Sequence, residues 1–261
     1  MKKISSRIRG FSLMELMVVM LIIGIIAAFV VPASTTILRG SQLVQASQII
    51  TDQFSLARQY ALSTNHPVEL RLIQYADPEV PGEVVNGSNS PSSGNFRAIQ
   101  IVQDVDTSDS NGNAIMKRVA LDKPQLLPQS IVMDQTQPMS TLIAEAKAPS
   151  NQNGIPNPTQ TPLLTTAVTN VDPVMPRNIG YNYQYVTFRF QPDGSTNLPA
   201  RSVSDSNGCW FVTLRNINDS NPTVSGTALV TQTGGGTRAV NFFTLLVDPV
   251  TGATKQFRPG I

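Results

Sequence analysis

The longest apolar stretch of the chain lies near its N-terminus, where about sixteen apolar or small residues run from Leu16 to Val31 without a charge. Together with the residues from Phe11 onward, this stretch has the length that an α-helix needs to cross a bilayer. One acid, Glu15, stands near its beginning, where a carboxylate would be costly in lipid. The pattern therefore predicts a transmembrane or assembly helix over residues 11–32, with Glu15 as a candidate functional residue.

A second helical pattern follows the apolar stretch. Its apolar positions recur at steps of three or four residues, and most polar positions lie opposite them. The apolar stripe consists of Leu43, Ala46, Ile50, Phe54, Ala57 and Ala61. We expect this amphipathic helix to dock on a sheet through the stripe. It should end at residues 63–67, because Asn65 tolerates the left-handed conformation and Pro67 cannot continue a helix.

Alternating apolar and polar residues predict an antiparallel β-sheet after the helix. The expected strands cover 68–72, 96–103, 116–121, 131–133, 183–190, 210–214, 241–247 and 254–258, and the last two form a terminal hairpin. Residues 76–95 and 104–114 are predicted to be polar loops. Segment 134–180 is rich in Pro, Thr, Asn and Gln, and we expect a loop insertion without which the fold is complete. The predicted fold class is α+β, with a long N-terminal helix packed on an antiparallel β-sheet head.

Basic residues precede the apolar stretch, at Lys2, Lys3, Arg7 and Arg9. By the positive-inside rule, the N-terminus stays in the cytoplasm and the chain after about Pro32 is exported. An ordinary secretory signal with cleavage after Ala33 is the alternative. The length of the apolar stretch and the presence of Glu15 argue against that alternative.

Residues 10–16, Gly-Phe-Ser-Leu-Met-Glu-Leu, resemble the class III signal of type IV prepilins and of the pseudopilins of type II secretion. The resemblance covers residues 10–32, and Pro32 falls where helices of this family commonly carry a proline. It implies a cleaved leader, residues 1–10, cut by a prepilin peptidase between Gly10 and Phe11. It also implies methylation of the new amine of Phe11. The implied location is the bacterial inner membrane, crossed once, with the head of residues 33–261 in the periplasm.

The same resemblance implies a role for Glu15 in assembly with other pilin or pseudopilin subunits. When apolar helices stack in a filament, the Glu15 carboxylate of one subunit can pair with the Phe11 amine of its neighbour. A buried charge without a partner costs several kcal/mol, so only one stagger of the helices satisfies both groups. The pair would therefore specify register more than it adds stability.

The head also resembles H-type pseudopilins and their type IV minor-pilin relatives. Ala57-Arg58-Gln59-Tyr60-Ala61 matches an "ARxxA" helix end, and Phe190-Gln191-Pro192-Asp193-Gly194 matches an "F-x-P-x-G" hairpin. Thr251-Gly252-Ala253 resembles a terminal "TGR" turn, with Ala253 in place of the usual basic residue. The resemblance does not extend to 76–95 or 134–180.

Composition limits the chemistry that the head can perform. The net charge is +2 and falls to about −2 without the basic leader, so no nucleic-acid partner is expected. One cysteine, Cys209, and one histidine, His66, leave no disulfide and no histidine-based metal cluster. We interpret Cys209 as a buried small hydrophobe and His66 as part of a turn. Residues 104–113 carry alternating oxygen side chains, but their glycine and acidic positions do not match a calcium loop.

These patterns favour an assembly protein with no cofactor, no metal and no catalytic site. The leading interpretation is a minor pilin or pseudopilin subunit of a type IV pilus-like or type II secretion filament. The alternative is a tip-located binding module for adhesion, DNA uptake or recognition of a secreted substrate. A membrane-anchored enzyme has no motif in its favour.

Overall fold

The computed structural model describes residues 13–80, 83–84, 90, 93–108, 114–135, 139–147, 163–166, 172, 174–199, 209–217, 223–225, 228–233, 236–239 and 241–258. The chain divides into two compact units, residues 1–41 and 42–261. Helix α1 (Leu13–Thr64) contributes to both units. It ends where the sequence predicts, and Asn65 just after it has a φ of 56°.

The second unit is built on an antiparallel sheet, to which the described residues contribute ten strands. These strands are β1 (Val68–Tyr75), β2 (Asn95–Ser108), β3 (Ala114–Ala120), β4 (Gln125–Leu126), β5 (Ile131–Met133), β6 (Leu163–Thr166), β7 (Gln184–Phe190), β8 (Trp210–Asn216), β12 (Phe242–Val247) and β13 (Thr254–Phe257). Their order is β13-β12-β8-β5-β2-β1-β7-β6, and β3 and β4 also pair with β2. A separate three-stranded sheet consists of β9 (Thr223–Ser225), β10 (Ala228–Thr233) and β11 (Gly236–Ala239).

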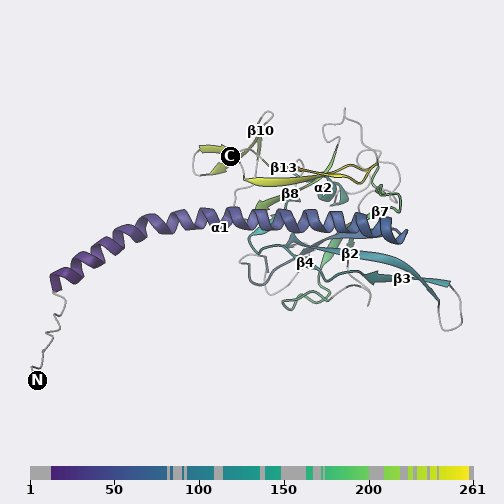
Figure 1. Ribbon diagram of the computed structural model, residues 1–261, viewed down its shortest axis with the longest axis horizontal. Coiled ribbons are helices and arrows are strands. Elements are labelled where there is room, and N and C mark those ends of the chain that lie inside the picture. Colours follow the sequence, from purple (N-terminus) through teal and green to yellow (C-terminus); the bar gives the residue numbers. More distant parts are fainter. Residues whose placement is uncertain are drawn as a thin grey trace, which may run out of the picture. The chain divides into compact units, whose positions relative to one another are not determined.

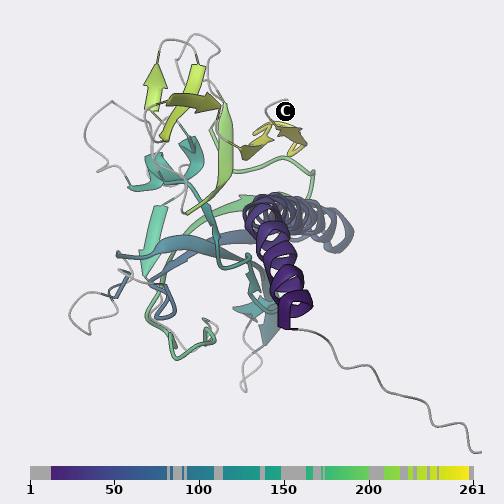
Figure 2. The same ribbon diagram turned by 90° about the vertical axis from the view of Figure 1, so that its left-hand side faces the viewer.

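The C-terminal half of α1, from Gln42 to Thr64, packs into the main core. The sheet curls around this half of the helix, with β13 and β8 on one side of it and β2 on the other (Figures 1 and 2). Every residue of the predicted stripe is buried, with at most 3% of its surface exposed: Leu43, Ala46, Ile50, Phe54, Ala57 and Ala61. They join the buried residues of β1, β2, β7, β8 and β12 in one hydrophobic cluster. The predicted docking face is therefore confirmed.

The opposite face of the sheet is covered as well. Ile73 and Tyr75 of β1 form a second cluster that also contains Ala98, Met175, Ile179, Tyr183 and Tyr185. As a result, all eight residues of β1 are buried, although polar residues alternate with apolar ones at 68–72. The segment around residues 172–183 supplies the additional cover.

The described residues of segment 134–180 contribute to both clusters, whereas the sequence predicts a loop insertion over this range. Helix α2 (Thr141–Lys147) places Leu142 and Ile143 in the main core. Strand β6 pairs with β7, and Met175 and Ile179 belong to the second cluster. Residues 148–162 lie outside the described residues. Sequence periodicity failed here because the buried positions are scattered among prolines and polar residues.

The other strand predictions agree with the structure, with shifted ends. The loop predicted for 104–114 is too long, because β2 continues to Ser108 and pairs with β3 from Ala114. The intervening residues 109–113 lie outside the described residues. The predicted terminal hairpin is confirmed by the pairing of β12 with β13.

Candidate functional site

The N-terminal part of α1 presents an apolar surface. From Leu13 to Ala28 every residue is exposed, and the large apolar side chains expose 45–78% of their surface. Within the part of the chain that the structure describes, no helix combines the length and the apolar character needed to cross a membrane. The transmembrane prediction for 11–32 is therefore not confirmed. An exposed apolar surface of this kind is typical of an interaction site.

Glu15 lies in the first turn of α1. A negative charge is favourable there, because the unpaired N–H groups at a helix start carry a partial positive charge. Its side chain is exposed amid the apolar residues Leu13, Met14 and Leu16. The predicted cleavage site, Gly10 and Phe11, lies outside the described residues, so its processing stays a prediction.

In the head, Arg58 joins the three motifs that resemble H-type pseudopilins. Its Nε lies 3.3 Å from the carbonyl oxygen of Gly194, in the 190–194 hairpin. The same Nε lies 3.2 Å from the carbonyl oxygen of Thr251, in the turn before β13. One guanidinium therefore links the helix to two loops that follow it by more than 130 residues.

The two turns approach each other so closely that glycine is required. Gly194 and Gly252 have φ values of +85° and +64°, a conformation that other residues rarely adopt. A Cβ atom on Gly252 would lie 2.1 Å from the carbonyl oxygen of Gly194. Ala253, at the position of the family's basic residue, lines a cavity of about 370 Å³ beside α1. The Arg58 junction is thus a structural element that holds the hairpins on the helix.

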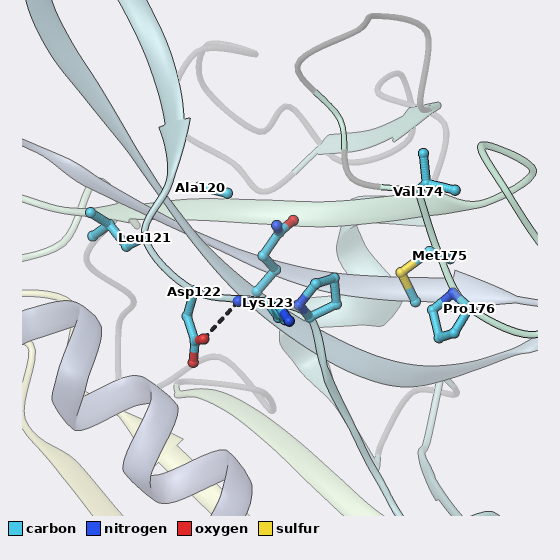
Figure 3. Close-up of a pocket in the computed structure, with 9 residues that line it drawn as sticks. Ala120, Leu121, Asp122, Lys123, Val174, Met175 and Pro176 are labelled. Atoms are coloured by element: carbon cyan, nitrogen blue, oxygen red, sulfur yellow. Dashed lines mark hydrogen bonds between the residues drawn. The ribbon is translucent and has the colours of Figure 1, made fainter.

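A larger pocket, of about 760 Å³, lies between two connections of the head. Residues 120–124, which lead from β3 to β4, form one side, and residues 174–176 form the other (Figure 3). Gln100 of β2 completes the lining. Both the oxygen and the nitrogen of its side-chain amide are buried and lack a hydrogen-bond partner. Sequence analysis did not single out Gln100, because one polar residue in a strand gives no signal.

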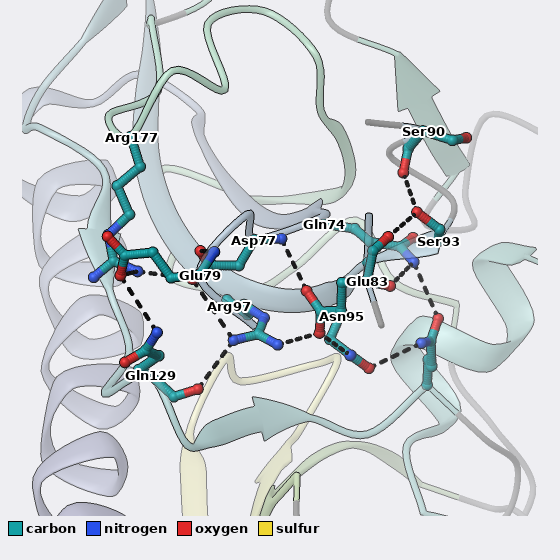
Figure 4. A network of polar contacts seen from close by, with 12 residues as sticks. Gln74, Asp77, Glu79, Glu83, Ser90, Ser93, Asn95, Arg97, Gln129 and Arg177 are labelled. Atoms are coloured by element: carbon teal, nitrogen blue, oxygen red, sulfur yellow. Dashed lines mark hydrogen bonds and ion pairs between the residues drawn. The ribbon is translucent and has the colours of Figure 1, made fainter. Parts of the chain in front are cut away.

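Buried charges anchor the loop after β1 (Figure 4). Arg97, 2% exposed, forms an ion pair with Glu83 and donates to the carbonyl oxygen of Gln129 at 3.0 Å. Glu83 also accepts the backbone N–H of Asp77 at 2.8 Å. Arg177 reaches Asp77 at 2.7 Å from the connection before β7. Because each of these buried charges has an opposite charge beside it, the network can hold the described part of the loop in place.

A second buried cluster lies on the sheet face away from α1. Arg71 donates to Glu69 at 2.8 Å and to Asp172 at 2.7 Å, and its guanidinium lies 4.3 Å from the ring centre of Tyr185. Burial by itself lowers the pKa of Arg71, but Glu69, Tyr185 and Asp172 together raise it. Burial raises the pKa of Tyr185 and of the neighbouring Tyr183. A permanently charged arginine between neutral tyrosines and carboxylates is a structural arrangement.

The structure also places Cys209, His66 and the residues considered as metal ligands. Cys209 is exposed, so the prediction that it is a buried hydrophobe is wrong; only its neighbour Trp210 is buried. His66 is half-buried directly after α1. Among the described residues, no group of three His, Cys, Asp or Glu side chains could hold a metal ion. Part of the acidic 104–113 segment lies outside that description.

Comparison with protein families gives one match, to the prokaryotic N-terminal methylation motif, over residues 5–31. No curated protein and no solved structure matches the chain. The matched residues contain the Gly-Phe-Ser-Leu-Met-Glu signature and the start of α1. They do not reach the head, so the motif does not distinguish between subfamilies. The N-terminal segment of the chain therefore carries the prokaryotic methylation motif, which supports a type IV prepilin-like protein.

Proposed function

We propose that this protein is a structural subunit, a minor pilin or pseudopilin, of a type IV pilus-like or type II secretion filament. The observation that carries the proposal is the methylation motif at residues 5–31, which leads directly into a helix with exposed apolar side chains. A structural subunit needs such a surface, because stacked helices exclude water from it. Burial of this apolar surface between subunits would stabilise the filament by about 25 cal/mol per Å² removed from water.

In this proposal the chain is cut between Gly10 and Phe11 by a prepilin peptidase, and the new amine is methylated. Residues 11–32 hold the subunit in the bacterial inner membrane until it enters the filament, with the head in the periplasm. Glu15 then pairs with the Phe11 amine of a neighbouring subunit. Both charges leave water together, so a wrong stagger would leave two charges unpaired.

The head is proposed to act by contact with other subunits and to have no catalytic activity. Its buried charges are paired inside the fold, and Arg58 holds the terminal turns on α1. Such a head keeps its shape while its loops face neighbouring subunits. An H-type pseudopilin is the finer assignment, and it is supported by the way Arg58 brings the three head motifs together.

Intact-mass analysis tests the first step. The chain is expressed with a prepilin peptidase and extracted from membranes, and we expect a mass that begins at methylated Phe11. A matched variant, Gly10→Leu, should keep the leader, because a large side chain does not fit where the peptidase requires a small one. A mature chain that begins at Ser34 would establish secretory-signal cleavage and overturn the proposal.

A further inference from the structure

Gln100 is an exception to the rule that buried polar groups are hydrogen-bonded. It is 1% exposed, yet neither atom of its side-chain amide has a partner. Leaving such a group unpaired destabilises the fold, because the hydrogen bonds it made to water are lost and not replaced. Gln100 lines the pocket of about 760 Å³, and this volume is within the range of ligand-binding sites. The geometry points to a group that enters the pocket and bonds to this amide.

The chemistry of the amide limits what that group can be. A carboxamide presents an acceptor oxygen and a donor nitrogen side by side. An anion would use only the donor and a cation only the acceptor. An extended residue of a peptide uses both, because its own N–H and C=O point to the same side of the backbone and each is an obligatory hydrogen-bonding group. A nucleobase edge also offers this pair, but the pocket lining includes no aromatic side chain on which a base could stack.

The walls of the pocket indicate what the peptide carries. Six of the nine lining residues are apolar: Ala120, Leu121, Pro124, Val174, Met175 and Pro176. Met175 and Pro176 face residues 120–123 across the pocket (Figure 3). Methionine adapts to aliphatic partners of different shape. Val174 is 64% exposed at the rim, where an incoming side chain would cover it.

We propose that this pocket binds an extended peptide segment of a partner protein, with the Gln100 amide bonded to the N–H and C=O of one residue and the apolar walls holding an aliphatic side chain. The proposal is independent of the assembly function, because it uses neither the N-terminal motif nor the apolar part of α1. It assigns the head a recognition site that the described contacts of the fold leave unused.

The test uses the full chain in detergent micelles, with N-acetyl-leucine N-methylamide as the probe. Methionine methyl groups are labelled with ¹³C, and the Met175 signal is assigned by Met175→Leu. We expect the Met175 signal to shift saturably with the probe. The analogue in which an ester oxygen replaces the N–H of leucine, 2-acetoxy-4-methylpentanoic acid N-methylamide, should bind about tenfold more weakly, since one hydrogen bond to Gln100 is lost.

Three variants complete the test. Gln100→Leu should weaken probe binding at least about tenfold while leaving the unfolding midpoint of the free chain unchanged or higher, because an unpaired amide is removed. Val174→Asp should also weaken binding. Val250→Asp is the matched control, since Val250 is similarly exposed, at 67%, but lies in the 248–252 turn; it should bind like the unmodified chain.

Several results would overturn the proposal. One is that Gln100→Leu binds the probe as well as the unmodified chain, and another is that its unfolding midpoint falls by as much as that of a core variant. The second result would mean that the amide is bonded within the fold. A Met175 shift with adenosine but not with the capped leucine would assign the pocket to nucleobases. Self-association of the pure chain that Val174→Asp abolishes would assign it to a second copy.

Discussion

Phe54 is the position where the docking of α1 on the sheet can be tested most directly. Its side chain is fully buried, and its ring centre lies 5.6 Å from that of Phe188 and 6.5 Å from that of Phe190. Replacement by alanine removes the ring and leaves a cavity between the helix and β7. Substitutions of this kind cost about 3–5 kcal/mol. Since domains are stable by about 5–15 kcal/mol, Phe54→Ala should remove a large share of the stability of the head.

The measurement is urea unfolding of the full chain in detergent micelles. Trp210, the single tryptophan, is 1% exposed in the same hydrophobic cluster, so its fluorescence reports unfolding of the head. With a urea dependence of about 2–3 kcal/mol per M, the unfolding midpoint should fall by about 1–2 M. Val44→Ala, on the same helix but 37% exposed, is the matched control and should change the free energy of unfolding by no more than about 0.5 kcal/mol. If the midpoints of the two variants coincide, the stripe does not hold the helix on the sheet.

Three further changes test the other sites. Glu15→Ala should leave membrane extraction unchanged and reduce recovery of the subunit in sheared filaments. Met14→Ala, also at an exposed position, should leave both unchanged. Equal filament recovery of the two variants would refute the pairing of Glu15 with Phe11. Arg58→Met should lower the free energy of unfolding by about 1–2 kcal/mol, because two carbonyl groups lose a partly exposed charged donor; a loss no larger than that of the exposed Gln59→Met would contradict this role. Burial raises the pKa of Tyr75 to about 12, so its stabilising contribution is complete below pH 10 and is lost as the pH rises toward 12. Urea unfolding between pH 9 and 12 should therefore show a shallower loss of stability for Tyr75→Phe, and an unchanged pH profile would refute it.

Local patterns were sufficient for the helix and most of the strands. Apolar residues at steps of three or four identify the buried side of α1, because a helix that packs on a sheet buries one stripe of its surface. Asn65 and Pro67 mark its end for reasons of backbone geometry alone. The terminal hairpin follows from turn residues that lie next to each other in the chain.

Patterns were insufficient where burial depends on distant segments. The alternation in β1 predicts a strand but not what covers its polar side, where Met175 and Ile179 pack and Asp172 pairs with Arg71. Likewise, nothing in the local sequence distinguishes Glu83 and Arg97 from exposed polar residues, and only the fold brings the two together as a buried ion pair. No local rule identifies which surface a later segment will cover.

The sequence alone predicts the N-terminal site, because the residues that a peptidase or a stacking helix would recognise are consecutive in the chain. The Gly10–Phe11 step, Glu15 and the apolar stretch form one continuous segment, and the family match falls on the same residues. Only the tertiary structure revealed the Arg58 junction and the Gln100 pocket. Arg58 meets carbonyl groups 136 and 193 residues away, and the pocket joins β2 to loops that follow it by some 20 and 75 residues. Such sites depend on strand order and register, which are set by the packing of the whole head.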